Sequence, residues 1–233
     1  MADLKTGTKE NMNMQQAPKP VPPPELEEKQ IATMDAAGLA GILKDAGASE
    51  FKKAKACVRL GELGAKEAVP LLAGLLNDPH MSVYARYGLE PIGDPSVDDA
   101  LRAALGKLQG ERLIGVVNSL GKRRDAKAVP ALVKMMAGAD ANLARAAAAA
   151  LGHIGGVGVM KELQAAFGKT TGMVKMAVAD ASLVCAERLL ADGKRAEALS
   201  MYSSLTGPSV PKPVRLAAMN GIIREETSPT RPR

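Results

Sequence analysis

The sequence predicts an all-α protein, a right-handed α-solenoid in which helical hairpins stack in a row. The segment LGELGAKEAVP at 60–70 returns in similar form as LGKRRDAKAVP at 120–130. Turns that contain glycine recur between these copies and beyond them. Apolar residues make up 46% of the chain but aromatic residues only 2%, and Trp is absent. Ala, Leu, Val and Met must therefore form the core, as suits packed helices.

The spacing of the turns defines the repeat. Four residues are taken as equivalent turn positions: Gly64, Gly93, Arg124 and Gly155. They lie 29, 31 and 31 residues apart (93 − 64, 124 − 93, 155 − 124), and a leucine precedes each by four residues. Glycine ends a helix at little cost because it adopts the left-handed backbone, and the proline of the AVP triplet fits the first turn of the next helix. These turns therefore divide the chain into units of about thirty residues.

Each unit is predicted to contain a first helix and a second helix. The second helices carry apolar residues at steps of three and four, such as Val69, Leu72 and Leu76, so one face of each is buried. One hairpin is too small to bury its apolar face alone, so neighbouring units must stack. The predicted pairs are 52–62 with 66–77, 81–91 with 96–108, 111–121 with 126–137, and 141–152 with 157–167.

The ends of the chain differ from the repeats. The prolines of APKPVPPP remove amide donors and favour extended backbone, so this segment is a spacer or a ligand for a Pro-rich-binding domain. Caps are expected at 34–47 and 214–223, and 173–205 resembles a tetratricopeptide hairpin that turns at Asp192-Gly193-Lys194. The predicted divisions are a disordered tail at 1–31, the solenoid at 32–226 and a disordered tail at 227–233.

The pattern of helix, LG-x-[LI]-G, AVP and helix resembles HEAT repeats, in the short form associated with phycobilisome lyases. More narrowly, YARYGLEPIGDPSVDDALRAALGKLQG and SLGKRRDAKAVPAL resemble the HEAT region of large exported bacterial multidomain proteins, over about residues 35–222. The resemblance implies an α-α superhelix with a binding or scaffolding role. It transfers no catalytic residue to this chain.

No residue pattern predicts a catalytic, cofactor or metal site. His80 precedes Met81 and His153 precedes Ile154, so the His-Glu pairs of iron-binding HEAT hydroxylases are absent. FGKT at 167–170 lacks the earlier glycine of a phosphate-binding loop. Two cysteines far apart in apolar helical patterns fit neither a disulfide framework nor a zinc site. We therefore expect a protein that is not an enzyme and holds no cofactor.

Two groups of polar residues are candidates for binding. In HEAT solenoids the second helices line the concave side, so polar residues there form a candidate ridge. The ridge comprises Asp99, Arg102, Lys134, Lys161 and Gln164. Lys122, Arg123 and Arg124 form the only tight basic cluster, at a turn where the helix C-terminus favours cations.

The leading functional hypothesis is a non-enzymatic scaffold that binds a protein partner on its concave surface. The net charge of +6 and the basic turns leave nucleic-acid binding as an alternative, although scarce aromatics argue against base stacking. Chromophore attachment, as in phycobilin lyases, is a weaker alternative. The sequence has no membrane span and no signal-peptide core, which predicts a cytoplasmic protein as written, or an exported one if the chain is processed or a fragment.

Overall fold

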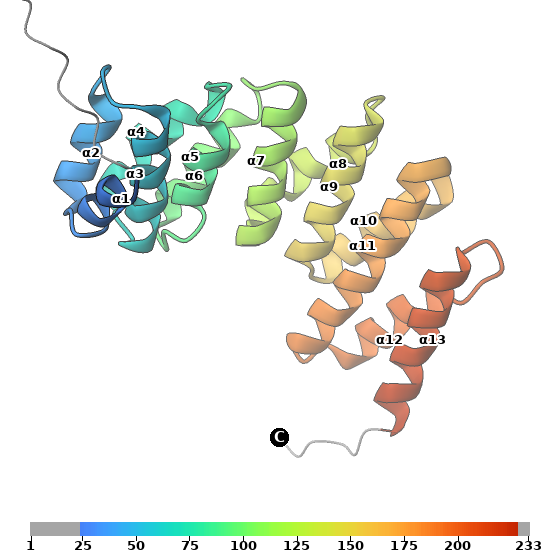
Figure 1. The fold of residues 1–233 in the computed structure, drawn as a ribbon. Helices are drawn as coiled ribbons and strands as arrows, with labels where there is room; N and C mark the ends of the chain where they lie inside the picture. The colour runs from blue at the N-terminus through green and yellow to red at the C-terminus, as the bar shows by residue number, and fades with distance from the viewer. Residues whose placement is uncertain (1–23, 228–233) are drawn as a thin grey trace, which may run out of the picture.

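The computed structural model describes residues 24–227, which form helices joined by turns. This range contains thirteen α-helices and no strand, so the predicted all-α solenoid is confirmed. Figure 1 shows the helices stacked side by side in one row, from α2 near the N-terminal end to α13 at the C-terminal end, with the C-terminal part of the row turned downward.

Five helix pairs form the row. The first helices are α3 (Glu50–Glu62), α5 (Ser82–Leu89), α7 (Gly110–Arg123), α9 (Ala141–Ile154) and α11 (Gly172–Ala191). The second helices are α4 (Val69–Gly74), α6 (Pro95–Ala104), α8 (Val129–Met136), α10 (Val157–Lys169) and α12 (Arg195–Ser204). Helices α4 and α8 are shorter than predicted, because each begins only after a 3₁₀ turn, η1 (Lys66–Ala68) or η3 (Ala126–Ala128), and α4 ends in another, η2 (Leu75–Asn77).

The ends of the row are closed by single helices. Helices α1 (Pro24–Ala32) and α2 (Ala36–Lys44) precede the first pair, and α13 (Lys212–Thr227) follows the last. Residues 1–23 of the tail predicted at 1–31 lie outside the described residues. From Pro24 the chain is helical, whereas the sequence predicts a disordered tail. Proline at the start of α1 loses no helical bond, and the Glu- and Lys-rich residues after it are good helix formers. Of the predicted tail at 227–233, only Thr227 is described, as the last residue of α13.

One aliphatic core runs through the row. The leucines that mark the repeat, Leu60, Leu89, Leu120 and Leu151, are each 0% exposed. Tyr202 is the one aromatic ring among the buried residues of the described range. The core therefore consists mainly of Leu, Val, Ala and Met side chains, as the composition predicts. Each fully buried leucine contributes about 2 kcal/mol through removal of its surface from water.

The two cysteines lie in this core, and we expect both to be unreactive in the folded protein. Cys57 and Cys185 are each 0% exposed. Burial raises the pKa of the Cys57 thiol to about 12 and that of Cys185 to about 11, so neither carries the reactive thiolate near neutral pH. A disulfide reagent such as DTNB should label neither thiol in buffer and both in guanidinium chloride. Fast labelling of the native protein would contradict this arrangement.

The two similar segments at 60–70 and 120–130 form matching bends. After α3, the Ala65 N–H donates to the Leu60 carbonyl at 3.0 Å, and after α7, the Asp125 N–H donates to the Leu120 carbonyl at 3.1 Å. The residue before each donor, Gly64 (φ 63°) or Arg124 (φ 58°), has the left-handed backbone. Both bends are Schellman motifs, which satisfy the last carbonyls of a helix.

Not every predicted turn has this geometry. Gly93 does not have a positive φ, so it is not equivalent to Gly64, and Asp94 instead caps α6 by accepting from the Ser96 N–H at 2.9 Å. The Schellman bend returns at Gly193, where the Lys194 N–H donates to the Leu189 carbonyl at 2.8 Å. The turn predicted at 192–194 therefore joins α11 to α12, while its kinship with tetratricopeptide repeats stays a prediction.

Arg124 occupies a position that favours glycine, and we expect Arg124→Gly to raise the free energy of unfolding. The left-handed backbone costs a non-glycine residue about 1–2 kcal/mol. The ion pair between Arg124 and Asp192 spans 3.5 Å and both side chains are more than a third exposed, so its loss costs less than about 1 kcal/mol. The net gain should be about 0.5–1 kcal/mol in urea unfolding. The reverse change at the matching bend, Gly64→Arg, should lower stability, and equal effects of the two changes would contradict the assignment.

The first helices approach one another at backbone distance. A Cβ atom placed on Gly88 of α5 would lie 2.5 Å from the Cys57 carbonyl oxygen of α3. One placed on Gly121 of α7 would lie 2.6 Å from Cα of Ala150 in α9, and one on Gly152 of α9 would lie 2.6 Å from a carbonyl oxygen of α11. Only glycine permits these three contacts.

The second helices contact one another less. Within residues 24–227, α9 packs extensively against α7 and α11, whereas contacts between α4 and α6 and between α10 and α12 are few. The first helices therefore pack more closely on one another than the second helices do, because glycine and alanine at the contacts let them come together. The expectation that the second helices line the concave side stays a prediction.

Candidate interaction surface

The first helices carry an exposed stripe of side chains. In α5, α7 and α9, the residues two and six positions before the buried leucine lie on the helix side away from the core. They are Val83 and Tyr87, Ile114 and Asn118, and Arg145 and Ala149. We call this surface the first-helix face, and it also includes Tyr84, His153, Met176 and Asp180. The same positions in successive repeats thus form one continuous surface.

Two of the few aromatic rings lie on this face. The chain has three Tyr, two Phe and no Trp, so exposed rings are informative here. Tyr84 is 39% exposed and Tyr87 is 51% exposed, and Val83 beside them is 41% exposed. Large apolar side chains return on α11, where Met173 is 58% and Met176 is 50% exposed. Tyr and Met are enriched in protein interfaces, so this distribution is typical of a surface that binds protein.

A groove of about 600 Å³ crosses α7, α9 and α11 on the same face. Its small side chains are Ala146, Ala149, Ala177 and Ala181. Its polar side chains are Glu111, Asn118, Asn142, Arg145, His153 and Asp180. The groove therefore combines alanines, which let an extended chain or a helix approach closely, with hydrogen-bonding groups of both charges.

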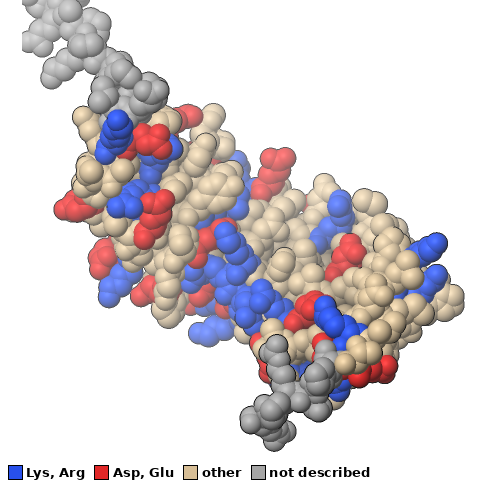
Figure 2. Space-filling model, turned by 60° about the horizontal axis from the view of Figure 1, so that its bottom comes forward, with Lys and Arg blue, Asp and Glu red and all other residues tan. Residues whose placement is uncertain are grey.

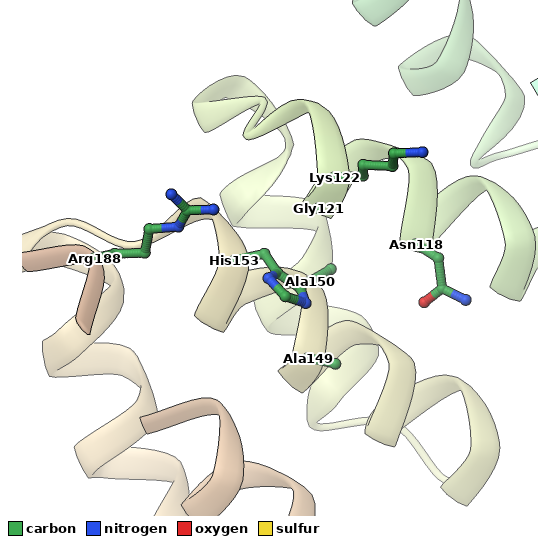
Figure 3. A pocket seen from close by; sticks show the side chains of 7 residues that line it. All are labelled: Asn118, Gly121, Lys122, Ala149, Ala150, His153 and Arg188. Atoms are coloured by element: carbon green, nitrogen blue, oxygen red, sulfur yellow. The ribbon is translucent and has the colours of Figure 1, made fainter. Parts of the chain in front are cut away.

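A second hollow of about 410 Å³ continues this groove, because both share Asn118, Ala149 and His153. Figure 3 shows Asn118 and Lys122 of α7, His153 of α9 and Arg188 of α11 around it, with the Lys122 side chain extending away from His153. Within residues 24–227, the side chains of Asn118, His153 and Arg188 form no hydrogen bond or ion pair. Three polar groups along the groove can therefore bond to a partner.

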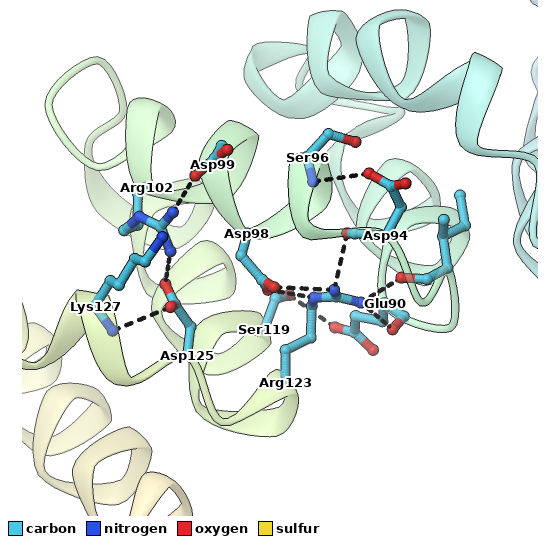
Figure 4. A network of polar contacts seen from close by, with 11 residues as sticks. Glu90, Asp94, Ser96, Asp98, Asp99, Arg102, Ser119, Arg123, Asp125 and Lys127 are labelled. Carbon is cyan, nitrogen blue, oxygen red and sulfur yellow. Dashed lines mark hydrogen bonds and ion pairs between the residues drawn. The ribbon is translucent and has the colours of Figure 1, made fainter.

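The predicted basic turn, unlike the groove, forms contacts within the protein. Arg123 is only 10% exposed and pairs with Asp98 at 2.5 Å, while its guanidinium also donates to the carbonyl oxygens of Glu90 at 2.8 Å and Ile92 at 2.7 Å. Figure 4 shows these contacts joining the end of α7 to the bend between α5 and α6. Arg123 therefore supplies the donors that this bend lacks, since no Schellman motif forms there.

The neighbours of Arg123 are also paired. The Lys122 ammonium lies 2.7 Å from a Glu90 carboxylate oxygen, and the Ser119 hydroxyl donates to the other oxygen at 2.7 Å. The Glu90 side chain is 7% exposed, so these two bonds satisfy a buried charge. With Arg124 paired to Asp192, all three cations of the basic turn have intramolecular acidic partners, which favours a structural role.

The predicted ridge is divided between structural and exposed residues. Arg102 pairs with Asp99 and with Asp125, whose side chain is 6% exposed, so this arginine fastens α6 to the bend after α7 (Figure 4). Lys134 and Lys161 are exposed, and Gln164 is half-buried. Among the described residues, the side chains of Lys134, Lys161 and Gln164 form no hydrogen bond or ion pair. The ridge lies on the second helices α6, α8 and α10.

The described residues contain neither a metal-binding cluster nor a membrane-spanning helix. Between Pro24 and Thr227 no group of three or more His, Cys, Asp or Glu side chains is placed to hold a metal ion. Over the same range, every helix is too short or too polar to cross a bilayer.

No family model matches the chain, and no curated protein matches it. Solved structures of other proteins are similar to the chain, including the following two. Human deoxyhypusine hydroxylase in complex with glycerol is 18% identical with a TM-score of 0.40, and the match covers 88% of this chain and 79% of that one. The complex of CpcE and CpcF of phycocyanin lyase from Nostoc sp. PCC7120 is 16% identical with a TM-score of 0.45, and the match covers 94% of this chain and 100% of that one.

The expectation that the chain is not an enzyme is corrected by these comparisons. Both similar structures are named as enzymes, a hydroxylase and a lyase. That expectation rests on a helical-repeat array without a recognisable catalytic motif. An array of helical repeats therefore does not exclude catalysis, and the activity of this chain is not assigned by its fold.

Proposed function

We propose that the protein is a HEAT-like scaffold that binds a protein partner on the first-helix face. The observation that carries the proposal is the exposure of Val83, Tyr84 and Tyr87 on α5 in a chain with few aromatic rings. The groove over α7, α9 and α11 extends the same face. A partner laid along it would contact an aromatic patch at one end and unpaired polar groups further along.

The close packing of the first helices supports the choice. A partner laid across neighbouring first helices would contact several repeats at once. The ridge on the second helices lacks exposed aromatic residues, and its Arg102 is occupied by Asp99 and Asp125. The first-helix face therefore offers the larger unpaired surface.

A capture experiment with two matched variants tests the proposal. The immobilised wild-type chain, the double variant Tyr84→Ser with Tyr87→Ser, and the double variant Lys134→Ser with Lys161→Ser are each incubated with extract of the source organism. Loss of a buried interface tyrosine costs about 2 kcal/mol, so the tyrosine variant should lose a protein that the wild type and the lysine variant retain. Loss with the lysine variant alone would place binding on the ridge and overturn the proposal.

Nucleic-acid binding is not favoured by the contacts of the basic turn. In the view of Figure 2, Lys and Arg side chains gather across the middle of the visible face, but Asp and Glu side chains lie beside them. Arg123 is paired with Asp98 and Lys122 is paired with Glu90. A labelled DNA duplex at low salt should therefore show no binding that weakens with added salt.

A further inference from the structure

The junction between α5 and α7 is built differently from its neighbours. A Cβ atom on Gly115 of α7 would lie 2.6 Å from Nε of Arg86. A guanidinium group thus lies between α5 and α7, whereas at the other junctions a glycine of one first helix meets the backbone of the next. Beside it, a hollow of about 590 Å³ is lined by Ser82, Val83 and Arg86 of α5 and by Glu111 and Arg112 of α7.

Two arginines line this hollow without a partner. Nε of Arg86 and Nε of Arg112 are buried from solvent and form no hydrogen bond. Neither guanidinium has an ion pair or hydrogen bond within residues 24–227. Arg59 also has a buried Nε without a partner, but its guanidinium pairs with Glu62 at 2.9 Å. A half-buried guanidinium without an acceptor is costly, and two at one hollow indicate a site for an anion.

Other donors point to the same conclusion. Ser82 is 6% exposed, lines the hollow, and its hydroxyl forms no hydrogen bond among the described residues. Helix α7 begins beside the hollow, and Gln109 provides no side-chain cap for its first N–H groups. An uncapped helix start attracts negative charge. The hollow therefore gathers unsatisfied donors from two helices.

The charges of the lining select the kind of anion. Arg86 and Arg112 carry two positive charges, and Glu111 lines the same hollow without pairing to either. The lining therefore carries one net positive charge. One carboxylate would neutralise it, whereas a phosphate dianion would leave a net negative charge in the hollow. Val83 belongs both to this lining and to the exposed patch with Tyr84 and Tyr87, so an apolar group next to the carboxylate would find a surface to pack on.

We infer that this hollow binds an acidic side chain of the protein partner, with Arg86 and Arg112 donating to its carboxylate and an adjacent apolar side chain packing on Val83. This deepens the proposed function by naming the chemistry of the partner, and it rests on that proposal. Planar guanidinium groups suit a carboxylate because each offers two parallel donors. The partner segment thus carries an acidic residue next to an apolar one.

Fluorescence anisotropy with a labelled synthetic peptide of Glu and Leu tests the inference at constant ionic strength. The wild type should bind this peptide at least about tenfold more tightly than a matched peptide of Gln and Leu. Arg86→Gln and Arg112→Gln should each weaken binding of the Glu peptide by about tenfold or more. Lys127→Gln is the matched control, because it removes one positive charge from an exposed side chain that has no partner among residues 24–227 and lies outside both the hollow and the first-helix face, and it should bind as the wild type does.

Thermal unfolding of the same variants separates binding from folding. Removal of an unpaired guanidinium should leave the melting temperature of each Gln variant equal to that of the wild type or above it. If one variant fails to fold, the other still decides, since the two arginines lie on different helices. Equal binding by all variants, or no preference for Glu over Gln, would overturn the inference. The inference would also be overturned if the Glu peptide does not bind while inorganic phosphate raises the melting temperature of the wild type but not that of Arg86→Gln.

The two proposals can fail separately. A partner captured by the wild type and lost with the tyrosine variant would still support the first-helix face if the Glu peptide fails to bind. In that case the arginines would not be the recognition site.

Discussion

Replacing Gly88 with alanine is expected to lower the free energy of unfolding by about 2–4 kcal/mol. The added Cβ would lie 2.5 Å from the Cys57 carbonyl oxygen and 3.1 Å from its carbon. These are backbone atoms, so relief requires α3 and α5 to separate along their contact. Separation would also loosen the packing around Leu89, which is 0% exposed. Urea unfolding followed by circular dichroism measures the loss.

A second glycine provides the control. Gly74 in α4 has nothing within 4 Å of an added Cβ, and its φ of −60° and ψ of −26° are helical. Gly74→Ala should therefore raise stability by about 0.5–1 kcal/mol, because alanine has the higher helix propensity. If Gly88→Ala were as stable as Gly74→Ala, the close approach of the first helices would be wrong.

Replacing Arg123 with methionine is expected to cost about 3–5 kcal/mol. Methionine keeps the apolar stem but removes the donors to Asp98 and to the carbonyl oxygens of Glu90 and Ile92. The Asp98 carboxylate and two carbonyls would remain partly buried without partners, and an unsatisfied buried group costs more than the bond itself contributes. The expected readout is a lower urea midpoint with an unchanged slope.

Lys127→Met is the matched variant for Arg123→Met. It removes one positive charge from the neighbouring turn, but Lys127 is exposed and its side chain has no partner among residues 24–227. Its stability should stay within about 0.5 kcal/mol of the wild type. A similar loss for both variants would show that net charge, rather than the Arg123 contacts, sets the stability of this junction.

Much of the fold could be predicted because its determinants are local. The leucines at 60, 89, 120 and 151 repeat with the turns, and all are buried. The bends at Gly64 and Gly193 follow from glycine in the left-handed region. Arg124 takes its place in the register although it is not glycine, because the residues around it match those around Gly64. Local pattern is therefore enough to predict the hairpins and their order.

The close contacts between first helices could not be predicted in the same way. They depend on which glycines meet a neighbouring backbone, and Gly88 and Gly74 look alike in the sequence although only Gly88 is in contact. The same limit applies to charge. Lys122, Arg123 and Arg124 have the pattern of a surface cluster, yet their acidic partners lie at Glu90, Asp98 and Asp192, which only the stacked repeats bring near.

The candidate site left a weak signal in the sequence. Tyr84 and Tyr87 are three residues apart in one short helix, with Ala85 and Leu89 at its buried positions. In a chain poor in aromatics, two rings beside core positions that are already filled could have indicated an exposed patch. The unpaired Arg86 and Arg112 left no such signal, because their lack of partners is a property of the assembled junction.

The contacts of Arg123 determine where the chain can be divided. The carbonyl oxygens of the bend after α5 accept hydrogen bonds from Arg123, the last residue of α7. An N-terminal fragment that stops after α6 would leave these carbonyl oxygens without that donor. A fragment that extends past the turn at Gly138 would include both the donor and the second helix of its pair. Limited proteolysis should therefore release stable pieces cut near residue 138 rather than near residue 106, and the smallest autonomous N-terminal piece comprises three pairs instead of two.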